Sequence, residues 1–183
     1  FYQSDDGRIR LQVRLEDALA DFEAVRERRP NERRVLVLDG LVRGLMAELF
    51  AAKGLDPCPR IREALALYQR ALDLRPDLAD TRAHRGRSLS ALAEWQGSHG
   101  EDPGPSYELA EKDLGEVIRL DIDRVPNLLT RGDLFNHRGT WEDERGGDGR
   151  AWYERAIADF ERVVTLAPED SEGWRGRAIA RLA

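Results

Sequence analysis

The sequence predicts an all-α protein, a right-handed solenoid of antiparallel helical hairpins with about three and a half repeats. Three observations lead to this prediction. Four segments align without a gap, each 46 residues after the one before. In every segment a small residue is followed four positions later by a bulky one and seven positions later by an apolar one, so all three lie on one helix face. A proline follows three of the four segments and separates one helix from the next.

Four columns of residues repeat in this register. The small column holds Ala18, Ala64, Ala110 and Ala156. The bulky column holds Phe22, Tyr68, Leu114 and Phe160. The apolar column holds Val25, Ala71, Val117 and Val163. The last column, inside the following helix, holds Gly40, Gly86, Gly132 and Ala178. Because glycine costs about 1 kcal/mol against alanine within a helix, we expect the last column to mark close helix–helix contacts.

We expect eight helices, at residues 8–28, 33–53, 60–75, 78–95, 106–121, 125–138, 150–166 and 170–182. The first helix of each pair is followed by a segment rich in Gly, Pro and acidic residues, and these segments, 54–60, 96–105 and 139–149, are expected as loops. The second helix of each pair ends near the proline position, because proline lacks the donor that a helix interior needs.

The helices are expected to form a single domain over residues 1–183. A partial repeat, 1–30, precedes three full repeats, 31–76, 77–122 and 123–168, and a second partial repeat, 169–183, follows them. The chain begins with Phe1 rather than Met, and a helical pattern continues to its last residue. We therefore expect a fragment of a longer protein.

The spacing of Ala156, Phe160 and Pro168 resembles the second helix of a tetratricopeptide repeat (TPR), and Trp174 followed by Ala178 resembles the Trp and Gly of its first helix. The resemblance covers nearly the whole chain and implies a protein-interaction scaffold. The period of that family is about 34 residues. Each repeat here therefore has 12 extra residues, which we place in longer first helices and loops. HEAT-type repeats, with periods near 46, are the alternative architecture, but the columns favour the TPR.

Composition excludes several classes of function. Lys and Arg number 29 against 35 Asp and Glu, which gives a net charge of -6, so nucleic acid is not expected as the main partner. No apolar run is long enough to cross a bilayer, so we expect no membrane insertion and a cytoplasmic location. The single cysteine, Cys58, excludes an internal disulfide and a cysteine-based zinc site.

Residue patterns that would support catalysis or cofactor binding are missing. His84, His99 and His137 have no metal-ligand spacing. The acidic segment 142–144 with Asp148 lacks the alternating order of a calcium loop, so we read it as a solvated loop. No Ser stands in a nucleophile-elbow motif. We therefore predict no cofactor and no enzymatic activity.

The resemblance also implies which first-helix positions face a concave groove. Carried over by register, these positions are Arg34, Val37, Leu41, Asp80, His84, Arg87, Leu129, Asp133, Asn136, His137 and Arg175. Helix 33–53 also offers Leu38 and Leu45, but it is apolar on most sides, so core and groove positions stay undecided there. Arg87, Asn136 and His137 give only fragments of the family's carboxylate clamp, and Asp80 and Asp133 would oppose it, so chaperone-tail binding is not expected.

The sequence thus predicts a scaffold that binds a peptide or a partner helix in its groove. The alternative is a regulatory or spacer segment of a larger signalling enzyme, for example a kinase, without catalysis of its own. Self-association through the uncapped repeat ends is a third expectation, because terminal repeats normally need polar caps.

Overall fold

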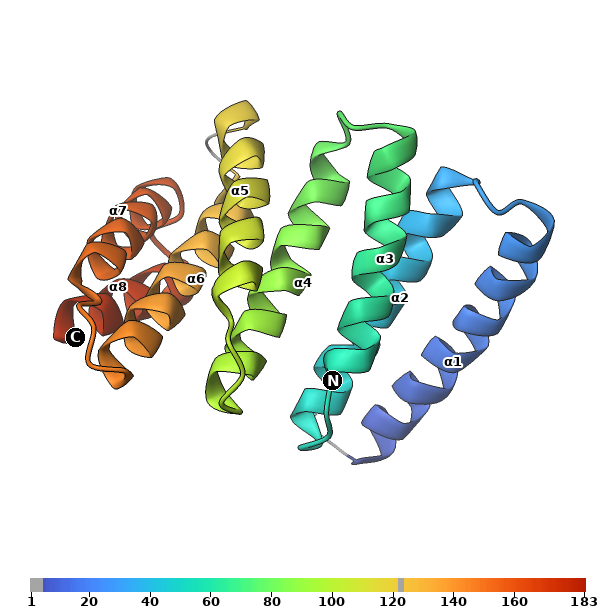
Figure 1. Cartoon of the computed structure of the whole chain (residues 1–183), viewed down its shortest axis with the longest axis horizontal. Helices are drawn as coiled ribbons and strands as arrows, with labels where there is room; N and C mark the ends of the chain where they lie inside the picture. The colour runs from blue at the N-terminus through green and yellow to red at the C-terminus, as the bar shows by residue number, and fades with distance from the viewer. Residues whose placement is uncertain (1–4, 122–123) are drawn as a thin grey trace. The chain divides into compact units, whose positions relative to one another are not determined.

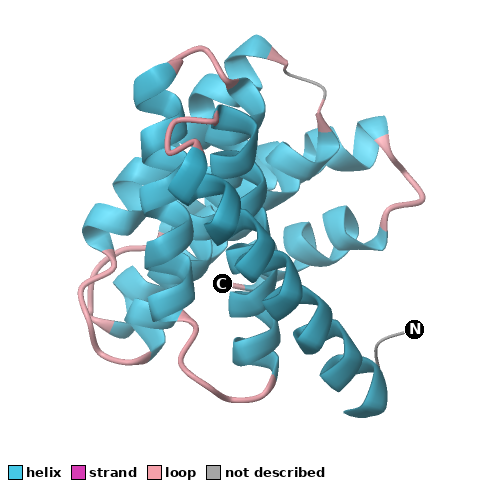
Figure 2. Ribbon diagram, turned by 90° about the vertical axis from the view of Figure 1, so that its right-hand side faces the viewer, coloured by secondary structure: helices cyan, strands magenta, loops and turns pink. Residues whose placement is uncertain are grey.

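The computed structural model describes residues 5–121 and 124–183, and every regular element within them is an α-helix (Figure 2). The helices of this described part are α1 (Asp5–Arg28), α2 (Arg33–Ala52), α3 (Cys58–Leu74), α4 (Ala79–Ser98), α5 (Gly104–Leu120), α6 (Val125–Glu144), α7 (Arg150–Leu166) and α8 (Ser171–Leu182) (Figure 1). The predicted all-α class is confirmed. The helix lengths repeat along the chain. The first helices of the pairs, α2, α4 and α6, have 20 residues each, and the second helices, α3, α5 and α7, have 17 residues each.

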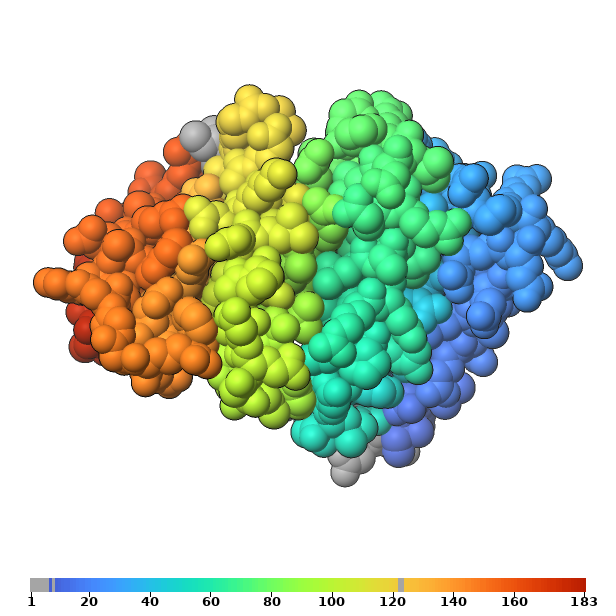
Figure 3. Space-filling model, in the orientation of Figure 1, coloured from blue at the N-terminus to red at the C-terminus, as the bar shows by residue number. Residues whose placement is uncertain are grey.

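The helix positions follow the register of the sequence columns. First helices begin at residues 33, 79, 125 and 171, and second helices begin at 58, 104 and 150, which is a spacing of 46 in both series. The contacts divide the chain into two compact units, Phe1–Ser88 and Leu89–Ala183, and α4 contributes to both. In unit 1, α2 packs against α1 and α3, and α3 lies in front of α2 in Figures 1 and 3. In unit 2, α6 packs against α5, α7 and α8.

The contact between the two helices of a pair, here called the hairpin seam, is built from the column residues. In unit 1 a Cβ on Gly40 would lie 2.6 Å from the Tyr68 ring, and in unit 2 a Cβ on Gly132 would lie 2.7 Å from the Phe160 ring. Tyr68 and Phe160 are fully buried. The predicted close helix–helix contacts are therefore present at both glycines, since any larger side chain would displace the ring.

Charged side chains reinforce the packing inside each unit. In unit 2, Arg131 donates from Nε and Nη2 to the two carboxylate oxygens of Asp159, both at 2.7 Å. In unit 1 the fully buried Asp39 lies 2.8 Å from the Nε atoms of both Arg26 and Arg43. A buried carboxylate is tolerated only when it is paired in this way, so both clusters fix the register of neighbouring helices.

Several predicted boundaries differ from the structure. Helices α4 and α6 end later than predicted, at Ser98 and Glu144, and α1, α3 and α5 begin two or three residues earlier than predicted, at Asp5, Cys58 and Gly104. Residues 96–98 and 139–144, expected as loop, are helical. The glycines that suggested loops are packing residues: a Cβ on Gly97 would lie 3.2 Å from the Trp141 ring, and one on Gly139 would lie 2.7 Å from the Tyr153 ring. The first helices α4 and α6 are therefore longer than predicted.

Acidic residues in the last turn of α6 and in the loop after it cap the start of α7. Asp143 accepts a hydrogen bond from the backbone N–H of Gly149 at 2.7 Å, and Asp148 accepts one from that of Arg150 at 3.1 Å. The Arg150 guanidinium holds the pKa of Asp148 at about 2. Among the described residues, no group of His, Cys, Asp or Glu side chains could hold a metal ion. These carboxylates satisfy helix N–H groups that would otherwise lack a partner.

Candidate protein-binding faces

The predicted groove positions fall in both units. Arg34, Val37 and Leu41 lie on α2, and Asp80, His84 and Arg87 lie on the part of α4 that belongs to unit 1. The remaining positions, on α6 and α8 of unit 2, are Leu129, Asp133, Asn136, His137 and Arg175.

In unit 1 the first-helix face carries an apolar stripe on α2, formed by Leu38, Leu41 and Leu45 and called the α2 stripe here. Leu38 is 47% exposed and Leu45 is 48% exposed, while Leu41 is half-buried. The three residues are spaced three and four positions apart, so they share one helix face. Val37, by contrast, packs against the core residues Leu36, Leu67 and Ala71. The exposed members, Leu38 and Leu45, give the stripe its accessible surface.

One of the polar groove positions predicted in unit 1, His84, makes an aromatic contact. His84 is half-buried, and its ring stacks on that of Tyr68 with centroids 6.1 Å apart. Burial raises the pKa of Tyr68, and the nearby positive charge of Arg87 opposes that shift. Arg34, Asp80 and Arg87 are exposed. The histidine therefore belongs partly to the packing, whereas Arg34, Asp80 and Arg87 lie at the surface.

In unit 2 the charged groups Glu94, Asp133, His137, Glu172 and Arg175 form what we call the α6–α8 patch. Nδ1 of His137 lies 3.6 Å from Oε2 of Glu94, and Arg175 pairs with Glu172. Burial raises the pKa of Asp133, and the positive charges of His137 and Arg175 oppose that shift. The patch carries both signs of charge, so it would select a ligand by pattern rather than by net attraction.

Two predicted groove residues of unit 2 contribute to helix packing. Asn136 is buried, and its Nδ2 donates to the backbone carbonyl of Gly176 at 3.1 Å. Leu129 is half-buried against the core around Phe160 and Val163. Arg175 is exposed and can reach a ligand, whereas Asn136 and Leu129 are covered by neighbouring helices. The register places them on the correct helix, but only the packing of α6 against α8 shows their role.

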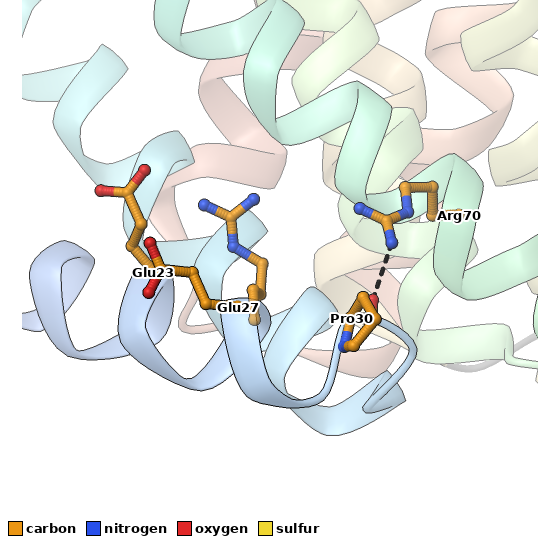
Figure 4. A pocket seen from close by; sticks show the side chains of 5 residues that line it. Glu23, Glu27, Pro30 and Arg70 are labelled. Atoms are coloured by element: carbon orange, nitrogen blue, oxygen red, sulfur yellow. Dashed lines mark hydrogen bonds between the residues drawn. The ribbon is translucent and has the colours of Figure 1, made fainter.

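A polar pocket of about 250 Å³ lies in unit 1, lined by Glu23, Arg26, Glu27, Pro30 and Arg70 (Figure 4). Arg70 reaches across from α3 and donates to the carbonyl of Pro30 at 2.7 Å. Arg26 is paired with Asp39. The lining contains no hydroxyl, thiol or histidine side chain, and its ionisable groups are two glutamates and two arginines.

None of the helices in the described part of the chain is long and apolar enough to cross a membrane.

The helical hairpins resemble those of solved TPR structures. A crystal structure of MamA matches with a TM-score of 0.65 and 14% identity, covering 94% of this chain and 75% of that one. The 41-end form of MamA from Desulfovibrio magneticus RS-1 matches with a TM-score of 0.61 and 18% identity, covering 96% and 80%. The TPR domain of OM64 from Arabidopsis matches with a TM-score of 0.53 and 19% identity, covering 82% and 94%. We found no matching protein-family model and no matching curated protein.

These matches show the fold and nothing about a ligand, because all three identities are low. They confirm the predicted arrangement of helices packed as sequential hairpins, as in TPR solenoids. Solenoids of stacked helical repeats present extended surfaces that can bind other molecules. What this chain binds depends on its own exposed residues and not on the fold alone.

Proposed function

We propose that the protein is an interaction module whose α2 stripe binds an amphipathic helix of a partner protein. The observation that supports this is the half-exposure of Leu38 and Leu45, which lie seven residues apart on one face of α2. An amphipathic helix presents apolar side chains at the same intervals, so its apolar face can lie along the stripe. Burying the exposed halves of both leucines contributes on the order of 2 kcal/mol to binding.

Exposed arginines of unit 1 indicate the charge of the partner helix. Arg34 lies one turn before Leu38 on α2 and is exposed, and Arg87 is exposed on α4. An arginine can pair with a carboxylate through two parallel hydrogen bonds, which lysine reproduces poorly. We therefore infer that the partner helix has acidic residues beside its apolar face.

The α6–α8 patch of unit 2 is proposed as a second, polar contact surface. Asp133, His137 and Arg175 belong to two first helices of the same unit, α6 and α8, which pack against each other. A surface of mixed charge contributes more to specificity than to affinity. Such a patch would reject a ligand that places like charges against its own.

A displayed library of random peptides tests the proposal without a known partner. We expect enrichment of sequences with apolar residues at helical intervals and with flanking acids. The variant Leu38→Glu/Leu45→Glu should lose capture of these peptides by about tenfold or more, because a carboxylate cannot be buried against an apolar face. Leu74→Glu is the matched control, since Leu74 is 49% exposed at the end of α3.

Thermal melting separates loss of binding from loss of folding, and all three positions should accept Glu with little change in melting temperature. Enriched peptides that bind the double variant as well as the wild type would show that the stripe is not the site. A library from which nothing is enriched would contradict peptide binding and favour the spacer alternative.

A further inference from the structure

The polar pocket of unit 1 is formed by α1, the turn after it and α3, and both helices pack against α2 (Figure 4). Its residues on α1 face the helices that follow them in the chain. Arg26 pairs with Asp39 of α2. Glu23 stands 46 residues before Gln69, which accepts a hydrogen bond from Arg85 of the first helix that follows it, α4. The pocket is therefore a feature of the contact between successive repeats, and it does not depend on what precedes α1.

Arg26 is held in place by a buried carboxylate. Its Nε atom lies 2.8 Å from Oδ2 of Asp39, which is fully buried, and the Arg26 side chain is only 22% exposed. Because the ion pair uses the Nε side of the guanidinium, the two Nη groups are left to donate elsewhere. Arg26 is thus a fixed donor in the lining of the pocket.

The charged groups of the lining have hydrogen-bonding capacity left over. Within the described part of the chain, no protein group accepts a hydrogen bond from the Nη groups of Arg26. The same holds for Nε and Nη1 of Arg70, whose Nη2 donates to the Pro30 carbonyl. Glu23 and Glu27 accept no hydrogen bond and join no ion pair with any described residue. A ligand could therefore bind to all four side chains without breaking a protein contact.

The positive and negative groups of the pocket are separated in space. Figure 4 shows Glu23 and Glu27 together on α1, and Arg70 on the opposite side, beside Pro30. An inorganic anion would meet the two carboxylates, and a metal cation would meet the two arginines, so neither matches the whole lining. A molecule with one charge of each sign at opposite ends matches both sides. The pocket volume of about 250 Å³ is below the ~300–1,000 Å³ of pockets for drug-sized ligands, so the ligand is small.

We propose that this pocket binds a small ω-amino acid, in which an ammonium and a carboxylate group lie at opposite ends of a short carbon chain. The carboxylate would accept hydrogen bonds from Arg26 and Arg70, and the ammonium would donate to Glu23 and Glu27. Because Asp39 already orders Arg26, binding loses less side-chain entropy there. The proposal uses no residue of the α2 stripe, so it is independent of helix binding.

Isothermal titration calorimetry of the full chain with 6-aminohexanoate tests the proposal. Hexanoate and hexylamine are the matched probes, because each has the same carbon chain but only one of the two charges. We expect 6-aminohexanoate to bind at least about tenfold more tightly than either, since each lacks one set of charge-assisted hydrogen bonds. No binding of 6-aminohexanoate at millimolar concentration, or equal affinity for all three molecules, would overturn the proposal.

Variants of the lining assign the two charges. Arg70→Gln and Glu27→Gln should each weaken the binding of 6-aminohexanoate by about tenfold. Asp21→Asn is the matched control, because Asp21 is exposed on α1 outside the lining, and this variant should bind like the wild type. All three positions are exposed, so thermal melting should show that each variant stays folded. Unchanged affinity in both lining variants, or an equal loss in Asp21→Asn, would show that the pocket is not the site.

Discussion

The Cζ atom of Phe160 lies 2.7 Å from the position that a Cβ on Gly132 would occupy. Gly176 on α8 approaches the same ring, so glycines from two first helices hold it in place. The ring is fully buried between these two helices. This arrangement connects α6, α7 and α8, and it explains why glycine is kept in a helix where it is otherwise unfavourable.

Gly132→Ala should destabilise the protein by about 1–3 kcal/mol, because the added methyl group overpacks the seam. Gly44→Ala is the matched control, since Gly44 also lies inside a first helix but a Cβ there would meet no atom within 4 Å. That control should gain about 0.5–1 kcal/mol from helix propensity. Urea denaturation of both variants and of the wild type measures the two changes in the free energy of unfolding. Changes of the same sign would contradict the packing role of Gly132.

The ion pair between Arg131 and Asp159 gives a second prediction. Asp159→Ala should cost about 2–4 kcal/mol, because it leaves a partly buried guanidinium without its carboxylate. The combined change Arg131→Met/Asp159→Leu should recover most of that loss, and Leu67 already occupies the column of Asp159 in unit 1. A double-mutant cycle in urea measures the coupling, and a double variant as unstable as Asp159→Ala would count against this explanation.

The half-buried position of Asp133 predicts a pH-dependent effect. Burial raises its pKa in the folded protein, although His137 and Arg175 oppose the shift. A carboxyl group with a raised folded pKa binds its proton more tightly in the folded state. The folded protein therefore loses stability as the pH rises from the unfolded pKa, about 3.9, through the folded pKa.

Asp133→Asn should therefore raise the free energy of unfolding relative to wild type at pH 7, and the gain should disappear below about pH 3.9. Asp148→Asn serves as the control of opposite sign, because Arg150 lowers the pKa of Asp148 to about 2. Chemical denaturation across this pH range makes the comparison. A gain for Asp133→Asn that is the same at every pH would exclude a titration effect.

The repeated columns made the fold predictable, because the residues of one hairpin seam recur at a fixed spacing. Leu114 and Phe160 are buried as the register requires. Phe22 is only half-buried, since the first helix that would cover its column is not among the described helices. The end of α6 was missed, because a glycine that packs under Tyr153 looks the same in sequence as a glycine that stops a helix.

The candidate binding faces were harder to predict than the fold. Asn136 was expected in a groove, but its partner is a backbone carbonyl 40 residues away, and no local pattern marks such a contact. Helix α2 is apolar on most sides, so its sequence does not show which of Val37 and Leu38 packs in the core and which lies at the surface. In the structure Val37 packs against Leu67 and Ala71, and Leu38 is exposed.

The most direct test of the proposed function is an NMR titration of the ¹⁵N-labelled protein with a library-selected peptide. If the α2 stripe is the binding site, the largest changes in chemical shift occur at the amides around Leu38, Leu41 and Leu45, and Leu38→Glu/Leu45→Glu abolishes them. Changes centred on the exposed side of α3, around Ala66 and Gln69, or changes that persist in the double variant, would contradict it.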